Sequence, residues 1–168
     1  MGDIDVDSQL IGSLAETYYK EYSDQKGGWA YTSLENIHNK FENDILEFKI
    51  GFLRPKIKIP AEIIPEIKKM AEPGCLEENN PSFVFDFLAC KICDVDDVSS
   101  VITSKTMDNF RWIEVKSEGG KISQNQLNAI LNAKMSFTLC VVHNVRETPY
   151  DVYLKFYYDE IPDWMIKQ

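Results

Sequence analysis

The sequence has no long apolar run. Its 168 residues include no stretch of about 18 consecutive apolar side chains, so a transmembrane helix is not expected. The first seven residues are mainly acidic and lack the basic and then apolar pattern of a secretory signal. We therefore expect a cytoplasmic protein without a membrane partner.

Cysteine and histidine are scarce. In a reducing cytosol the four cysteines are expected to be free thiols. Cys90 and Cys93 have the spacing of a zinc or iron–sulfur ligand pair, but the other two, Cys75 and Cys140, stand alone. Small buried hydrophobic residues are therefore the better interpretation of the Cys90 and Cys93 pair. Neither histidine has metal-ligand spacing, and both are assigned to the structure.

Basic residues are in the minority. The chain has 18 Lys and Arg against 27 Asp and Glu, a net charge of −9. Contacts to phosphate groups need Lys and Arg, so this balance argues against non-specific duplex binding. Several basic residues nevertheless lie close together, among them Arg54, Lys56 and Lys58. A metal site also concentrates carboxylates, and the charge therefore does not exclude a nuclease.

Apolar and polar residues alternate in a way that predicts a mixed fold. We expect helices at 8–25, 34–41, 61–71 and 122–135, and strands at 29–32, 45–50, 52–59, 82–92, 110–116, 137–145 and 152–158. The polar segment 94–109 is predicted to be a surface loop or hairpin, and 161–168 a terminal turn. This order predicts an α/β fold of the mixed α+β type, with a central mixed β-sheet flanked by helices. With 44% hydrophobic residues, the chain is expected to form a single domain, 1–168.

The most informative stretch is the predicted strand 110–116. Side chains of a strand alternate between faces, so Glu114 and Lys116 share one face while Ile113 and Val115 share the other. Two ionisable groups on a mostly apolar strand are costly to desolvate unless they have partners. A metal ion and a phosphate are the partners that would use both charges.

A second acid, Asp86, lies inside the apolar run 83–89. One interpretation is a strand end at which Asp86 caps or turns the chain. The other is a carboxylate that faces a metal ion. The segment between Asp86 and Glu114 is long enough to join two neighbouring strands, which would bring Asp86, Glu114 and Lys116 together at one end of the sheet.

Three segments together resemble a known family. They are Phe-Asp-Phe-Leu-Ala-Cys-Lys at 85–91, Trp-Ile-Glu-Val-Lys at 112–116 and Ser-Gln-Asn-Gln at 123–126. This order resembles the PD-(D/E)XK nuclease superfamily, in particular its VRR-NUC and archaeal Holliday-junction resolvase-like branch. In that family an Asp opens one core strand, a Glu-x-Lys lies on the next, and a Gln follows on a helix. The resemblance implies a restriction-endonuclease-like core at about 82–145, with the helix and the basic strand and helix region of 8–71 packed on it.

The chain departs from the family pattern at one position. The family often has proline before the Asp, where this chain has Phe85. Pro81-Ser82 offers an alternative register, but Ser82 cannot act as an anionic ligand, so we place the motif on Asp86. In the other register the site would be degenerate and inactive.

The resemblance also implies roles for these residues. Asp86 and Glu114 would bind Mg²⁺ or Mn²⁺, which prefer oxygen ligands, and the backbone carbonyl of Val115 would add a ligand. Lys116 would orient the attacking water or stabilise developing charge. Relatives often supply a further acid from the first helix, for which Glu16 is the candidate and an ordinary exposed glutamate the alternative. Glu21 is a weaker choice.

Gln126 has two interpretations. In the family it contacts the site, but Ser123-x-x-Gln126 also matches a capping box, in which Ser caps the helix and Gln bonds back to the Ser amide. Both can hold, because a capped helix start points its free amides toward an anion. Ser123 and Lys121 are therefore candidates for nucleic-acid contacts, with the basic residues Arg54, Lys56 and Lys58 at a lower level.

These observations favour a divalent-metal-dependent nuclease that hydrolyses phosphodiester bonds in DNA, either branched or single-stranded, with Asp86, Glu114, Lys116 and Gln126 as the site. Relatives among the resolvases imply a homodimer. The alternative, supported by the net charge and by Phe85, is a catalytically inactive member of the fold that binds nucleic acid or protein. A third interpretation is a plain structural domain in which Glu114 and Lys116 form an exposed ion pair on a strand.

Overall fold

The computed structural model describes residues 2–26, 28–74, 82–92, 101–102 and 105–167. Its helices are α1 (Gly2–Lys26), α2 (Leu34–Lys40), α3 (Ile64–Met70) and α4 (Gln124–Asn132). Its strands are β1 (Trp29–Ser33), β2 (Ile45–Glu47), β3 (Lys56–Lys58), β4 (Phe87–Lys91), β5 (Val101–Ile102), β6 (Phe110–Ser117), β7 (Ser136–His143) and β8 (Tyr153–Tyr158). A short 3₁₀ turn at Asp163–Met165 lies within the predicted terminal turn.

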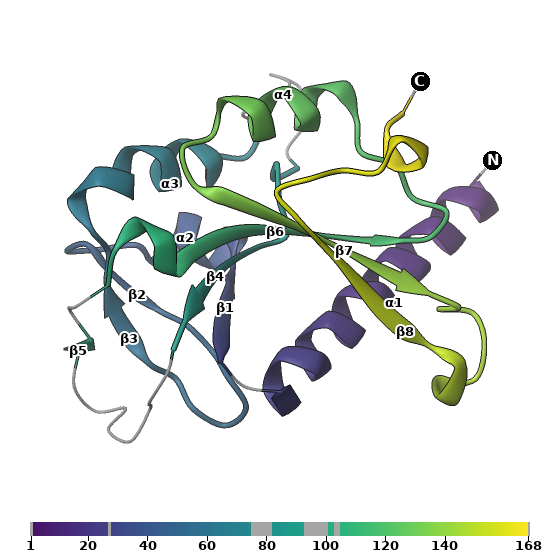
Figure 1. The fold of residues 1–168 in the computed structure, drawn as a ribbon, viewed down its shortest axis with the longest axis horizontal. Helices are drawn as coiled ribbons and strands as arrows, with labels where there is room; N and C mark the ends of the chain where they lie inside the picture. The colour runs from purple at the N-terminus through teal and green to yellow at the C-terminus, as the bar shows by residue number, and fades with distance from the viewer. Residues whose placement is uncertain (1, 27, 75–81, 93–100, 103–104, 168) are drawn as a thin grey trace.

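The main sheet has the strand order β1-β4-β6-β7-β8. Its neighbours pair antiparallel except β6 and β7, which run parallel and are joined through α4. Such a parallel connection needs a crossover, and α4 supplies it. Figure 1 shows α3 and α4 on one side of this sheet and α1 crossing the other side. The predicted mixed α/β fold, a mixed sheet flanked by helices, is therefore confirmed.

A separate small sheet has the order β2-β3-β5. Strand β5 lies in the segment that we predicted to be a loop or hairpin, and it pairs parallel with β3 through Val101 and Ile102. Those two residues are β-branched and apolar, which favours a strand locally even in polar surroundings. Residues 93–100 and 103–104 of the same predicted loop lie outside the described residues.

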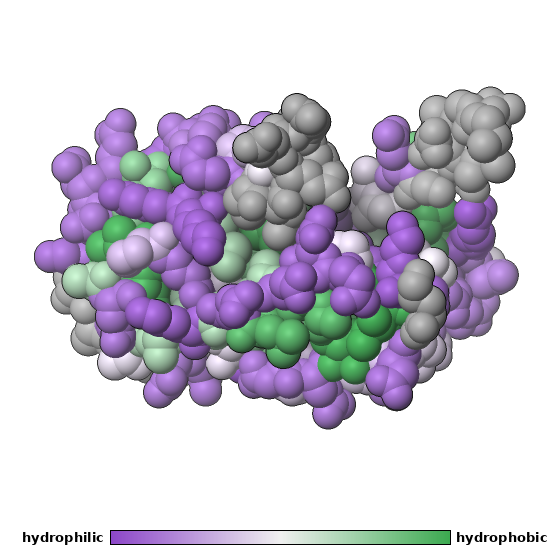
Figure 2. Space-filling view, turned by 90° about the horizontal axis from the view of Figure 1, so that it is seen from above, coloured by the Kyte–Doolittle hydropathy of each residue, from purple (hydrophilic) through white to green (hydrophobic). Residues whose placement is uncertain are grey.

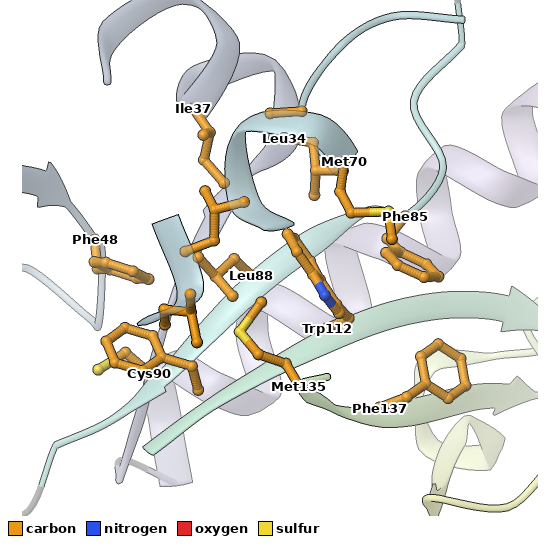
Figure 3. Close-up of a cluster of buried hydrophobic side chains, with 14 of the residues drawn as sticks. Leu34, Ile37, Phe48, Met70, Phe85, Leu88, Cys90, Trp112, Met135 and Phe137 are labelled. Carbon is orange, nitrogen blue, oxygen red and sulfur yellow. The ribbon is translucent and has the colours of Figure 1, made fainter. Parts of the chain in front are cut away.

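Hydrophobic clusters fill both sides of the main sheet. The larger one joins the sheet to α2, α3 and α4, and it contains Trp112, Leu88 and Phe137 (Figure 3). The smaller one joins the sheet to α1 through Ala15 and Tyr19. Residues of β4 alternate between the two clusters, as side chains of a strand covered on both faces must.

Several predicted elements are longer than the real ones. The run 82–92 was expected to be one strand, but β4 begins only at Phe87. The predicted strands 45–50 and 52–59 are shortened to β2 and β3, because the chain reverses at Gly51, which has φ 60, and Ile50 pairs with Leu53. Helix α4 ends at Asn132, ahead of Met135, whose side chain is buried in the larger cluster.

Two of the cysteines can be placed. Cys90 and Cys140 are free thiols and fully buried, which confirms the interpretation of Cys90 as a small hydrophobic residue. Burial raises the pKa of both thiols. Cys75 and Cys93 lie outside the described residues.

The surface above α3 and α4 is mainly hydrophilic, and its apolar side chains lie in a few groups between polar ones (Figure 2). Among the helices of the described residues, none combines the length and the apolar character that crossing a bilayer requires.

Candidate active site

The chain bends at Asp86, immediately before β4. Phe85 and Phe87 are only two residues apart, yet Phe85 joins the larger cluster and Phe87 the smaller one. In a continuous strand they would share a face, so the alternation breaks between them. The centre of the Phe85 ring lies 5.4 Å from that of Trp112 and 5.6 Å from that of Phe137. The three side chains belong to the cluster drawn in Figure 3. The residue that stands where the family has proline therefore anchors the bend in the core.

Asp86 extends the pairing of β4 with β6 by one residue, through its backbone N–H and its side-chain carboxylate. Its backbone N–H donates to Ile113 O at 3.1 Å, and its Oδ2 accepts from the backbone N–H of Val115 at 2.7 Å. The predicted position inside a strand is wrong, because Asp86 precedes the first residue of β4. Its carboxylate binds the backbone of β6 just beyond the residues that pair with β4. The interpretation of Asp86 as a residue that turns the chain therefore holds for its backbone. Its carboxyl group lies beside other acidic residues, which the other interpretation requires.

Val115 presents its backbone to the same edge. The N–H and C=O of one strand residue point to the same side, so the Val115 carbonyl points toward the edge where its N–H meets Asp86. This is the position in which the predicted carbonyl ligand would be needed.

Glu114 is buried beside α4, with only 4% of its surface exposed. Its Oε2 accepts a hydrogen bond from Gln126 Nε2 and lies 3.9 Å from Lys116 Nζ. Because Glu114 is buried, the interpretation of Glu114 and Lys116 as an exposed ion pair is wrong. A buried carboxylate needs such partners, since leaving it unpaired would cost several kcal/mol (roughly 3–5).

Gln126 holds both roles that the sequence allowed. Its backbone N–H donates to Ser123 Oγ at 3.1 Å, and the Ser123 N–H donates to Gln126 Oε1 at 3.3 Å, which completes the capping box. The Nε2 of the same amide donates to Glu114 and, at 2.9 Å, to Val84 O. The amide oxygen thus caps α4 while the nitrogen positions the buried carboxylate.

Helix α1 brings a third acid to the site. The carboxyl of Glu16 hydrogen bonds to that of Asp86, which in turn hydrogen bonds to Glu114. Burial, then the hydrogen bond and the charge of Asp86, raise the pKa of Glu16 to about 8, against a smaller opposing effect of Lys20. Burial and the charge of Glu114 raise the pKa of Asp86 well above its ordinary value, although the Val115 N–H opposes this. The contact between Glu16 and Asp86 therefore favours the protonated form of these two carboxyls.

Most of the polar residues described above line one cleft of about 1090 Å³. The members predicted from the sequence are Asp86, Glu114, Val115, Lys116, Gln126 and Glu16. The exposed Glu21 lies outside this set. We call this hollow the carboxylate cleft.

The carboxylate cleft suits a divalent cation in its chemistry. Close carboxyls with raised pKa values mark a place where added positive charge would be favourable. Among the described residues, however, no three or more Asp, Glu, His or Cys side chains are grouped so as to hold a metal ion. Asp86, Glu114 and the Val115 carbonyl would thus be the protein's share of the ligands, with water and phosphate oxygens as the remainder.

The predicted nucleic-acid contacts are dispersed. Lys121 Nζ donates to the backbone carbonyl of Trp164, away from the cleft lining. Ser123 is occupied as the cap of α4. The three lower candidates, Arg54, Lys56 and Lys58, are exposed around the β2–β3 hairpin. Arg54 lines one hollow with Lys20, Lys40 and Lys49, and Lys56 lines another with Lys40.

Two loops contribute residues to the cleft that were not among the predicted site residues. Glu118 follows β6, and Asn144 and Arg146 follow β7; all three line the cleft. The carboxyl ends of parallel strands meet at one edge of a sheet, so a predicted parallel pairing of these strands would have placed both loops together. Glu118 accepts from the Asn144 backbone N–H at 3.0 Å and lies 3.2 Å from His143 Nδ1, which ties the loops to each other.

Comparisons with protein-family models, with curated proteins and with solved structures found no significant match.

Proposed function

We propose that the protein is a divalent-metal-dependent nuclease that hydrolyses phosphodiester bonds in DNA. The observation that carries this proposal is the convergence of Asp86, Glu114, Lys116 and Gln126 in one cleft. These residues come from a bend, a strand and a helix start, and a bound cation would stabilise carboxyls that meet in one hollow. The resemblance to the PD-(D/E)XK superfamily supports the same function.

Each residue of the carboxylate cleft has a distinct task in this proposal. Asp86 and Glu114 would hold Mg²⁺ or Mn²⁺, and Gln126 fixes the Glu114 carboxylate through its amide nitrogen. The bound cation supplies positive charge that acidifies water and neutralises the phosphate. Lys116 reaches into the cleft beside Glu114, where its ammonium orients a water molecule or stabilises charge that develops on the phosphate.

The test is cleavage of plasmid, single-stranded and branched DNA in the presence of Mg²⁺ or Mn²⁺. Glu114→Ala and Lys116→Ala are expected to lower the rate by about 100-fold or more, because each removes a group that acts on the reacting phosphate. Lys155→Ala is the matched control, since Lys155 also lies on a strand but outside the residues that line the cleft. Absence of metal-dependent cleavage, or equal rates for the three variants and the wild type, would overturn the proposal.

A catalytically inactive module that binds nucleic acid or protein is the second candidate. It is favoured by the absence of a three-ligand group among the described residues and by the net charge of −9. Titration with Mn²⁺ separates the two functions. The nuclease binds Mn²⁺ in a manner that depends on Asp86, whereas the inactive module shows no such binding.

A further inference from the structure

A second hollow, of about 440 Å³, meets α1 at Lys20, one helical turn after Glu16 of the carboxylate cleft. Four basic residues line it: Lys20, Lys40, Lys49 and Arg54. We call it the basic pocket. Of its described lining residues, Glu47 alone is acidic. Positive side chains that gather in a hollow repel one another, and this arrangement is unexpected in a chain with a net charge of −9 unless an anion uses it.

The basic pocket is built on a fixed framework. Asp24 of α1 accepts from Lys49 Nζ at 2.8 Å and from the Gly51 backbone N–H at 2.8 Å. Tyr31 of β1 exchanges two backbone hydrogen bonds with Lys49, at 3.0 and 2.8 Å. The loop that carries Arg54 is thereby attached to both α1 and β1.

Three cations of the basic pocket remain for a ligand. The Lys49 ammonium is neutralised by Asp24, whereas Lys20, Lys40 and Arg54 are exposed. Lys20 Nζ lies 5.6 Å from the centre of the Phe87 ring, a contact that leaves its donors available. An ammonium and a guanidinium around a hollow are the donors that recognise phosphate.

The basic pocket and the carboxylate cleft are immediate neighbours. Glu16 lines the cleft and Lys20, four residues later on α1, lines the pocket, which places their Cβ atoms roughly 5–6 Å apart. On the sheet side, Asp86 lines the cleft and the next residue, Phe87, lines the pocket. Lys20 also acts electrostatically on Glu16. A single extended strand of nucleic acid could therefore contact both hollows at once.

We propose that the basic pocket binds a backbone phosphate of the nucleic-acid strand whose neighbouring phosphate lies in the carboxylate cleft. The proposal rests on the nuclease function proposed above and adds the direction in which the strand runs, along α1 from Glu16 toward Lys20. It also explains how a chain with an acidic cleft retains its substrate. Lys20, Lys40 and Arg54 supply the attraction that the acids at the cleft do not.

The test compares two double variants that change the net charge equally. Lys40→Gln with Arg54→Gln alters the basic pocket, whereas Lys69→Gln with Lys134→Gln alters another hollow, between α3 and α4. Binding of a labelled single-stranded DNA oligonucleotide is measured by fluorescence anisotropy in Ca²⁺ at several salt concentrations. The first double variant is expected to bind about tenfold more weakly, and its slope of log affinity against log salt is expected to become shallower by about 0.7, the value for one lost phosphate contact on a single strand. The second is expected to match the wild type.

Equal affinities and slopes for the two double variants would overturn the inference. So would inorganic phosphate that displaces the oligonucleotide as effectively as unlabelled DNA does, because the basic pocket would then serve a free anion. Steady-state cleavage separates this inference from the proposed function. A rise in KM that is confined to the Lys40→Gln and Arg54→Gln double variant supports both the nuclease function and the phosphate site in the basic pocket. A wild-type protein that binds DNA through the basic pocket but never cleaves it overturns only the nuclease function. If this double variant cleaves DNA with an unchanged KM, only the phosphate site is overturned.

Discussion

Gln126 connects the stability of the fold to the candidate site through a single amide. Its oxygen completes the capping box of α4, and its nitrogen donates to Glu114 and to Val84 O. We expect Ser123→Ala to lower the free energy of unfolding by about 1 kcal/mol, the usual effect of losing a cap. Gln126→Ala should lower it by roughly 1–3 kcal/mol more, because a buried carboxylate then loses a donor. Urea denaturation measures both values, and equal losses would contradict the contact with Glu114.

Glu16 makes stability depend on pH. Its pKa rises from 4.5 to about 8 on folding, so between these values the folded chain holds a proton that the unfolded chain has lost. Stability should therefore fall as pH rises from about 5 to about 8 and level off above that, and Asp86 acts in the same direction. Thermal denaturation in EDTA across this range measures the fall. Glu16→Gln should reduce it and Glu21→Gln, on the exposed face of the same helix, should not. An unchanged pH profile in Glu16→Gln would contradict the contact between Glu16 and Asp86.

Much of the candidate site could be predicted from single residues. Glu114 and Lys116 stand out because charges are rare on a strand whose other residues are apolar, and Ser123 with Gln126 forms a local capping signal. These signals need only neighbours in sequence. Glu16 carried no such signal, because a glutamate on an exposed helix and one facing Asp86 look alike until the helix is docked on the sheet.

The bend before β4 controls the site at the level of elements. Phe85 is 3% exposed and packs between Trp112 and Phe137, which holds the chain where Asp86 turns toward the cleft. Phe85→Ala should lower the free energy of unfolding by roughly 3–5 kcal/mol, the usual range for removing a buried aromatic ring. Phe52→Ala, at a fully exposed phenylalanine, should change it by less than about 0.5 kcal/mol. Chemical denaturation of both variants is the measurement, and similar small changes would contradict the anchoring role of Phe85.

The bend at Asp86 also explains why β6 was predicted well and β4 was not. Along β6 the alternation of apolar and charged residues predicted both its extent and its two faces. The run 82–92 is apolar on both sides of Asp86, so its residues give no sign of the point where they change faces. Strand β5 was missed for a related reason, since two apolar residues in a polar segment form a strand only because β3 lies beside them.

At the scale of the whole molecule, the charges are separated in a way that composition conceals. The carboxylate cleft and the basic pocket lie one helical turn apart on α1, although their residues come from distant parts of the chain. The net charge of −9 reveals neither the carboxylate cleft nor the basic pocket. The basic residues near Arg54 were recognisable as a group, but their partners Lys20 and Lys40 became apparent only when α1, β1 and the β2–β3 hairpin were assembled.

We propose that Asp86 and Glu114 hold a divalent cation at which phosphodiester bonds are hydrolysed. The most direct measurement is the rate of Mn²⁺-dependent DNA cleavage by the wild type and by Asp86→Asn, with circular dichroism to show that both are folded. The wild type is expected to cleave DNA only when Mn²⁺ is present, and Asp86→Asn is expected to cleave it more slowly by about 100-fold or more. A wild type that never cleaves DNA, or a folded Asp86→Asn variant as fast as the wild type, would contradict it.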